Sequence, residues 1–163
     1  MNTAYLLIGG NLGDRFFYLS EAKKQIEIKC GNIVAQSSIY ETAAWGITEQ
    51  PNFLNQVLVL ETMYAPEELL QQLLSIEEKM GRVRNIKLGP RTIDIDILLI
   101  DDQIIHTNTL SVPHPALTQR KFALIPLDEV AGDLIHPVEK KSIHQLLLNC
   151  TDVLDVQKKS ANA

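Results

Sequence analysis

The chain has 163 residues, of which 45% are hydrophobic and 21% are charged, and a formal net charge of −5 at pH 7. These values are typical of a folded domain and exclude a disordered chain, so we expect a single domain over residues 1–163. The acidic balance argues against nucleic acid or an anionic membrane as the main partner. We recognise neither a secretory leader nor an apolar run long enough to span a bilayer. We therefore expect a cytoplasmic protein, which we take to be a monomer.

The apolar patterns predict elements in the order strand, helix, strand, strand, helix, strand. The expected strands are at residues 4–8, 33–40, 53–63 and 93–100. One expected helix follows Asp14, a suitable N-cap, and ends near Cys30. The other begins at Pro66 and ends at Gly81. This order is that of a ferredoxin-like sandwich, an α+β fold in which helices pack on an antiparallel sheet.

Two loops and an irregular C-terminal part complete the predicted organisation. Residues 41–52 and 82–90 are expected to be loops, and the first is long enough to suggest a function. Further elements are expected after the fourth strand: a short return strand at 104–105 and helices at 120–130 and 142–149. The small and polar tail from Gln157 onward is expected to fray and to have no role.

The run from Gly89 to Leu99 is the most informative stretch of the sequence. Because a strand sends successive side chains to opposite faces, its isoleucines lie on one face and Asp94 and Asp96 project together from the other. Two carboxylates at this spacing repel each other unless a cation lies between them. Mg²⁺ prefers oxygen ligands and usually brings substrate phosphates with it. A solvated polar face is the alternative if this segment is considered alone.

Basic side chains lead into this acidic strand. They are Arg82, Arg84, Lys87 and Arg91. Guanidinium groups bind phosphate in a bidentate manner, and cations beside a metal-binding strand suit phosphoryl transfer. A solvated run of charges is the alternative. His114 lies between two prolines and is followed by Arg120, so it could fix a donor near a phosphate or could be a surface histidine in a turn.

An aromatic and an amide side chain follow the first long loop. Phe53 and Asn55 share a strand face, so they could stack on and pair with a flat heterocycle. Core packing is the usual role of a phenylalanine in a strand, but Asn55 on the same face is poor core material. The turn Gly9-Gly10-Asn11 lacks the spacing of a dinucleotide-binding motif or a P-loop, and it indicates only that backbone can approach a ligand closely.

Taken together, these segments resemble the 6-hydroxymethyl-7,8-dihydropterin pyrophosphokinase (HPPK) family from residue 3 to about residue 150. The matching residues are Gly10-Asn11-Leu12, Tyr40-Glu41-Thr42, Asn52-Phe53-Leu54-Asn55, Glu77, Gly81-Arg82-Val83-Arg84, Gly89 to Asp96, Val112-Pro113-His114 and Arg120-Lys121-Phe122. The resemblance implies a ferredoxin-like core. It also implies transfer of an intact pyrophosphoryl group from ATP to the pterin hydroxymethyl group, with release of AMP, in tetrahydrofolate biosynthesis.

The resemblance also implies roles for individual residues. The catalytic set is Arg82, Arg91, Asp94 and Asp96, and the two aspartates bridge two Mg²⁺ ions. The pterin-binding set is Thr42, Ala43, Ala44, Trp45, Phe53, Asn55 and Phe122, with the pterin between the two phenylalanine rings. The ATP-binding set is Glu77, Arg84, Lys87, Arg91, Ile97, Ser111, His114 and Arg120.

Several positions depart from the best-known members of the family. Leu88 replaces a common tryptophan, Lys87 an arginine, Thr109 an arginine, Pro115 a tyrosine and Leu74 a glutamine. Because these changes remove cations and an aromatic cap, we expect them to weaken ATP binding or loop closure more than they change the reaction.

Two other function classes remain as alternatives. A nucleotidyltransferase also combines a glycine-rich turn with Asp-x-Asp, but there the turn lies shortly before the acidic strand, whereas Gly10 and Asp94 are far apart. Such an enzyme would release pyrophosphate rather than AMP. A regulatory ferredoxin-like domain that binds a small molecule or RNA is the other alternative. It would bind its ligand tightly without consuming ATP, and the acidic balance argues against RNA.

Overall fold

The computed structural model describes residues 1–43, 51–81 and 92–159. Within this part of the chain, six strands form one antiparallel sheet. The strands from one edge to the other are β5 (Asp94–Ile100), β1 (Asn2–Gly10), β4 (Phe53–Thr62), β3 (Ile39–Thr42) and β8 (Val156–Lys159), and β2 (Asn32–Gln36) also pairs with β4. The long central strands β1 and β4 place residues from distant parts of the sequence in neighbouring rows.

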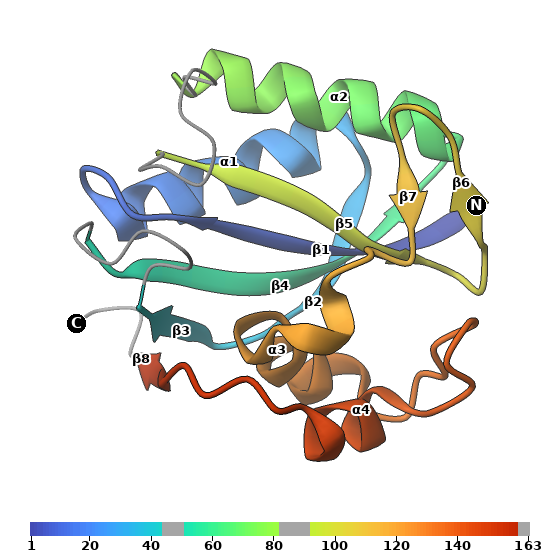
Figure 1. Cartoon of the computed structure of the whole chain (residues 1–163). Coiled ribbons are helices and arrows are strands. Elements are labelled where there is room, and N and C mark those ends of the chain that lie inside the picture. Colours follow the sequence, from blue (N-terminus) through green and yellow to red (C-terminus); the bar gives the residue numbers. More distant parts are fainter. Residues whose placement is uncertain (44–50, 82–91, 160–163) are drawn as a thin grey trace.

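Helices cover both faces of this sheet (Figure 1). The first pair is α1 (Arg15–Lys29) and α2 (Pro66–Lys79), and the second is α3 (Lys121–Ala131) and α4 (Ile143–Asn149). Each pair closes its own cluster of buried apolar side chains against the strands. Coverage on both faces explains why β1, β4 and β5 contain continuous runs of buried residues rather than a strict alternation.

The order of elements confirms the predicted α+β class with helices packed on an antiparallel sheet. Asp14 caps α1 as expected, because its side chain accepts a hydrogen bond of 3.1 Å from the backbone N–H of Phe17. The predicted apolar face of α1 is buried at Leu19, Ala22 and Ile26. None of the helices in the described ranges is long and apolar enough to cross a bilayer.

The expected single strand at 33–40 is wrong, because Ser37 divides it into β2 and β3. The Ser37 backbone N–H donates to the Val57 carbonyl at 2.9 Å, and its hydroxyl oxygen accepts the Val57 N–H at 2.9 Å. This exchange lets both short strands pair with β4 across the break. Glu41 and Thr42, which the sequence places in a loop, are therefore the last two residues of β3.

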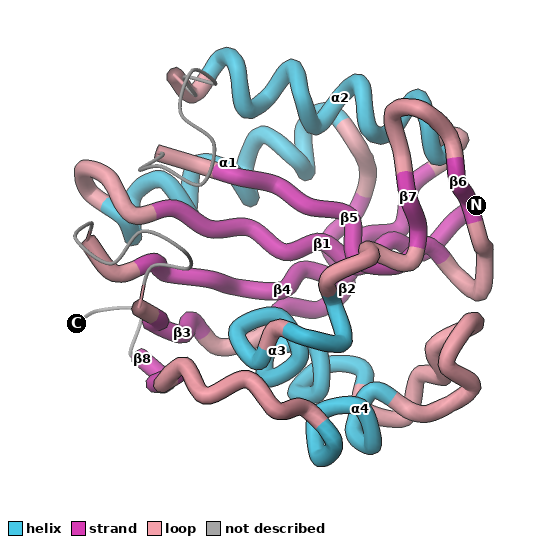
Figure 2. The backbone as a smooth tube through the Cα atoms, in the orientation of Figure 1, coloured by secondary structure: helices cyan, strands magenta, loops and turns pink. Residues whose placement is uncertain are grey.

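The C-terminal part also differs from the expectation. The chain leaves α4 as an extended segment and ends in β8, beside β3 (Figure 2). The predicted fraying from Gln157 is therefore wrong for β8, while residues 160–163 lie outside the described ranges. The expected short strand near 104–105 is β6 (Ile105–His106), which pairs with β7 (Ser111–Val112) in a separate hairpin. A short 3₁₀ helix, η1 (Leu117–Gln119), precedes α3.

Candidate active site

The acidic strand has the predicted two-faced character. Ile95 and Ile97 are 5% exposed and belong to the apolar cluster under α1 and α2, whereas Asp94 and Asp96 are only partly buried. The two carboxylates therefore project together from the face on which α3 packs. The alternation of the sequence Asp-Ile-Asp-Ile thus separates core from site within four residues.

A pocket opens on this α3 face, at the end of the sheet where β5 begins. The empty space within it is about 590 Å³, a figure that includes open solvent at its mouth. The lining residues are Leu7, Gly9, Thr42, Ala43, Phe53, Asn55, Asp94, Asp96, Arg120 and Phe122. Residues predicted to bind pterin, metal and ATP phosphates from four separate segments therefore meet in one cavity.

Strand register explains how the acidic and amide side chains come together. Gly9 on β1 is paired with Asp94 on one side and with Asn55 on the other. Since neighbouring strands lie about 4.8 Å apart, the backbones at Asp94 and Asn55 are about 10 Å apart across Gly9. This span separates the carboxylate side of the pocket from its amide side.

Gly9 must lack a side chain for this row to form. A Cβ atom built there would lie 2.2 Å from Asn55 Oδ1 and 2.6 Å from the Leu54 carbonyl oxygen. The lack of a side chain at Gly9 in β1 therefore allows the Asn55 side chain to lie over bare backbone. Sequence reasoning did not include Gly9 or Leu7 in the site, although a glycine inside a strand often marks such a close approach.

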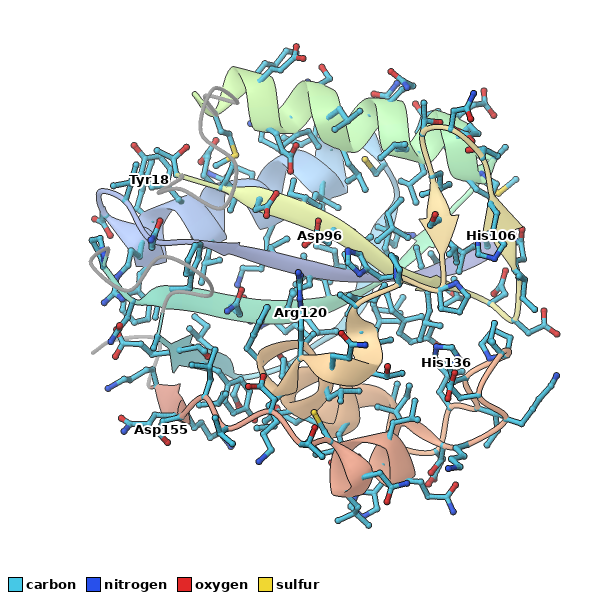
Figure 3. All side chains as sticks on the ribbon, in the orientation of Figure 1. Tyr18, Asp96, His106, Arg120, His136 and Asp155 are labelled. Atoms are coloured by element: carbon cyan, nitrogen blue, oxygen red, sulfur yellow. The ribbon has the colours of Figure 1, made fainter. Side chains whose placement is uncertain are left out.

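Two side chains near the start of α3 form the opposite wall. Arg120 Cζ lies 5.6 Å from the centroid of the Phe122 ring, within the range of a cation–π contact. Figure 3 shows Arg120 projecting from the start of α3 toward the strands, and Asp96 on β5. Phe53 and Phe122, the two rings expected around the pterin, line the pocket from different elements, β4 and α3.

Thr42 lines the pocket and carries a buried hydroxyl. The residue is 2% exposed, and within the described part of the chain its hydroxyl oxygen has no hydrogen-bond partner. Gln56 Oε1 is the other such buried side-chain atom among the described residues. A buried hydroxyl without a partner is costly, so Thr42 is well suited to a polar ligand.

The turn after β1 holds the chain that leads into Phe53. The Asn11 amide donates to the Pro51 carbonyl at 2.9 Å, and the Arg15 guanidinium donates to the Asn52 carbonyl at 3.0 Å. Arg15 also binds Glu41 at 2.5 Å. Its hydrogen bond, aided by that of Lys159, holds the pKa of the Glu41 carboxyl below its usual value despite partial burial.

His114 has a fixed orientation beside the pocket. Its backbone N–H donates to the Leu98 carbonyl at 2.9 Å, and its Nδ1 accepts the Ala116 N–H at 3.1 Å. A neutral ring with Nδ1 occupied in this way carries its proton on Nε2. Burial, together with the nearby Arg120, lowers the pKa of His114, while Asp94 opposes this shift. The ring is thus a neutral Nε2–H donor at neutral pH.

Glu77, predicted to contact ATP, makes its described contact with the backbone. Its side chain is 1% exposed, and Oε2 accepts the Ile95 N–H at 2.6 Å. Because β5 is at the sheet edge, this N–H would otherwise face no strand. Glu77 therefore fixes the backbone between the two aspartates from the opposite face of the sheet.

The other predicted ATP-binding residues are distributed around the pocket rather than within its lining. Ile97 packs its side chain in the core, and Ser111 is half-buried in β7. Thr109 donates to Glu67 Oε2 at 2.7 Å and thereby ties the hairpin to α2, while Pro115 is exposed and Leu74 is half-buried. The remaining predicted positions lie outside the described residues: Ala44, Trp45, Arg82, Arg84, Lys87, Leu88 and Arg91.

Several proteins are similar to this chain in sequence, and solved structures are similar to it in fold. The 2-amino-4-hydroxy-6-hydroxymethyldihydropteridine pyrophosphokinase of Aquifex aeolicus (strain VF5) is 43% identical over 145 residues, covering 89% of this chain and 90% of the relative. The folic acid synthesis protein fol1 of Pneumocystis carinii is 40% identical over 85% of this chain, which spans 19% of that longer protein. The crystal structure of wild-type Plasmodium falciparum HPPK-DHPS with SDX-DHP has a TM-score of 0.73 at 19% identity, covering 91% of this chain and 43% of that one.

The structural likeness, at this low identity, supports the fold alone. The sequence carries the family assignment. Residues 5–132 match the model of the 7,8-dihydro-6-hydroxymethylpterin-pyrophosphokinase (HPPK) family, a range that includes every lining residue of the pocket. The chain therefore belongs to the HPPK family.

Proposed function

We propose that the pocket between β5, β4 and α3 is where this chain performs the reaction of its family. The chain is an ATP-dependent pyrophosphokinase of folate synthesis. It transfers pyrophosphate to the hydroxymethyl group of 6-hydroxymethyl-7,8-dihydropterin and releases AMP. The observation that carries the proposal is the row Asp94, Gly9, Asn55, which places carboxylates and a heterocycle-binding amide about 10 Å apart in one cavity.

We assign the pterin to the Asn55 side of the pocket. Phe53 and Phe122 supply aromatic faces for stacking, and Asn55 supplies both a donor and an acceptor for the edge of the heterocycle. Thr42 adds a buried hydroxyl that lacks a partner among the described residues. Ala43 lines the same wall, and we extend this binding set by resemblance to Ala44 and Trp45, which lie outside the described residues.

We assign the triphosphate of ATP to the side of Asp94 and Arg120. Arg120 offers a charge-assisted donor, and His114 offers a neutral Nε2–H nearby. By resemblance, the cations of residues 82–91 complete this set, with Arg82 and Arg91 as catalytic groups. Because the substrate hydroxyl is itself the nucleophile, the protein needs only to position the reactants and neutralise charge.

Asp94 and Asp96 fit a Mg²⁺ site that ATP helps to form. Both carboxylates face the pocket from one strand, and their oxygen atoms are the ligands that Mg²⁺ prefers. The described ranges contain no group of three or more His, Cys, Asp or Glu side chains that could hold a metal by itself. Phosphate oxygens and water would therefore complete the coordination. Mg²⁺ bound there would neutralise the phosphate oxygens, and we propose two such ions.

We also propose that residues 1–163 act as one domain, as a monomer, in the cytoplasm. A single domain is supported by the six-stranded sheet, whose two apolar clusters are both closed by elements of the same chain. Sedimentation of the purified protein at assay concentration tests whether it is a monomer.

A phosphorus NMR time course with ATP, Mg²⁺ and 6-hydroxymethyl-7,8-dihydropterin tests the proposed function. We expect AMP and a new pterin diphosphate signal. Release of pyrophosphate would indicate a nucleotidyltransferase, and unreacted ATP beside tight ligand binding would indicate a binding domain. In Asp94→Asn we expect turnover to fall by more than about 100-fold without a change in melting temperature. Asp102→Asn, in the turn that follows β5 and exposed to solvent, is the matched control.

A further inference from the structure

The segment from Asp152 to Lys159 contacts both walls of the pocket, although the sequence suggested no role for its end. At one end, Asp152 Oδ2 accepts the backbone N–H of Lys121, the first residue of α3, at 3.0 Å. Its other oxygen accepts the Leu154 N–H at 3.0 Å. Arg120, the N-cap residue of α3, makes no side-chain cap of its own. Asp152 therefore caps α3 in its place, beside Arg120 and Phe122.

At the other end, β8 is joined to the strand that carries Thr42. Val156 pairs with Thr42 in the register of β3 and β8. Lys159 Nζ lies 3.3 Å from Glu41 Oε1, and the second oxygen of Glu41 binds Arg15. The strand end that brings Thr42 to the pocket is thus held from outside by β8 and by a pair of cations.

The link between these two anchors is short and contributes little to the core. Three residues separate Asp152 from β8, and an extended chain rises by about 3.3 Å per residue. The link therefore limits how far the start of α3 can move away from β8. Val153 is 94% exposed and Asp155 lies at the surface, as Figure 3 shows at the end that leads into β8. Leu154 and Val156 are only partly buried, so the segment adds little apolar surface to the two core clusters.

We propose that Asp152 and Lys159 are positioning residues for the pterin, which together set the separation between the Phe122 wall and the Thr42 wall. The inference rests on the proposed function, because it takes this pocket as the pterin site. Stacking between two rings depends on the width of the gap, and displacement of a wall by a fraction of an ångström weakens binding without removing any group that touches the ligand.

The test is the dissociation constant of 6-hydroxymethyl-7,8-dihydropterin, measured by fluorescence titration without ATP, with kcat and melting temperature alongside. We expect Asp152→Ala to raise the constant by about ten-fold, because the start of α3 beside Phe122 loses its anchor to this segment. The Asp152→Asn variant should recover most of the affinity, because its amide oxygen can still accept the Lys121 N–H. We expect kcat at saturating pterin to change by less than about two-fold, since the reacting groups stay in place.

Two further variants separate positioning from general stability. Asp155→Ala is the matched control on the same segment, because Asp155 is exposed and bonds only to Gln157 among the contacts described, so its pterin affinity should equal that of the wild type. Lys159→Met should weaken pterin binding, and it keeps the test available if Asp152→Ala does not fold, because the Lys159 side chain is a third exposed. The double variant should lose less than the product of the single losses if both residues set one gap.

The outcomes distinguish this inference from the proposed function. A wild-type protein that neither binds the pterin nor turns it over with ATP and Mg²⁺ would overturn both. A wild type that binds, together with Asp152→Ala and Lys159→Met variants that melt earlier but bind the pterin equally well, would overturn the positioning role alone.

Discussion

The two faces of the sheet show how one set of strands can serve stability on one side and chemistry on the other. Under α1 and α2 the sheet contributes mainly apolar side chains, among them Leu54, Leu58 and Ile95. Under α3 and α4, an apolar cluster fills one half and the pocket occupies the other, with Asn55 and Asp94 in its lining. Alternate residues of the same strand therefore either pack in the core or line the pocket.

The comparison shows that the face of the sheet on which a side chain lies decides whether it serves the core or the pocket. Closeness in the sequence does not decide it. Asp94 and Ile95 are neighbours in the chain but face opposite layers. Glu77 is the exception, since it comes from α2 yet holds the Ile95 N–H between the two aspartates. Changes on the closed face should thus alter stability, and changes on the open face should alter binding and turnover.

The largest expected effect, on stability alone, comes from truncating a core residue of β4. Leu58 is fully buried under α1 and α2, so Leu58→Ala should lower the free energy of unfolding by about 2–5 kcal/mol. We expect kcat to stay within about two-fold at temperatures where the variant is folded. Urea denaturation and steady-state kinetics measure the two quantities. A large loss of kcat in folded Leu58→Ala would contradict the division between faces.

A methyl group added at Gly9, between Asp94 and Asn55, should have a smaller effect, and this effect should be on substrate binding. In Gly9→Ala, the new Cβ would meet Asn55 Oδ1 at 2.2 Å and the Leu54 carbonyl oxygen at 2.6 Å, so the amide and the adjoining backbone of β4 must move. We expect the KM for the pterin to rise about ten-fold while the KM for ATP changes little, because Asp94 lies on the other side of Gly9. Equal losses for both substrates would show that the two sides of the pocket are not independent.

The smallest expected effect is a loss of stability at acid pH, caused by the two histidines that precede a proline, His136 and His114. His136 Nδ1 accepts the N–H groups of Val138 and Glu139, and burial lowers its pKa, against the effect of Glu139. A histidine whose folded pKa is depressed binds a proton more readily in the unfolded state, so stability falls as the pH drops below about 6.5. His114 has the same turn and a lowered pKa beside the pocket.

Melting temperatures at pH 7.5 and pH 5.5 measure this loss. The window lies above the range in which Glu41 and Glu129, whose pKa values are lowered, take up protons. We expect His136→Gln to reduce the acid-induced fall in melting temperature and to leave pterin affinity unchanged. A wild-type melting temperature that rises toward pH 5.5 would show that the sign is wrong.

Local patterns were sufficient to predict much of the fold and of the site. The period of two in β5 placed Asp94 and Asp96 on one face, and the capping role of Asp14 followed from its place before an apolar helix. The resemblance supplied Phe122 and Arg120 from a distant segment, and the pocket brings both beside Phe53. These features depend on side-chain periodicity or on residues that can be matched one by one.

The features that were missed depend on contacts between distant parts of the chain. Ser37 breaks a strand through its exchange with Val57, and no local signal marks it. The strand β8 is short and mostly polar, so only its pairing with β3 makes it a strand. Asp152 caps a helix that begins 31 residues earlier. A sequence read in windows of ten to fifteen residues cannot contain such information.

The unpartnered hydroxyl of Thr42 has a consequence for selectivity. In the ligand-free protein this buried group is already desolvated, so a ligand that satisfies it gains the bond without a further desolvation cost at that atom. An analogue of similar shape that offers no complementary polar atom would leave the hydroxyl unmet and would be rejected more strongly than its lost contact area suggests. Discrimination among closely related heterocycles can therefore reside in one buried hydroxyl of the pocket wall.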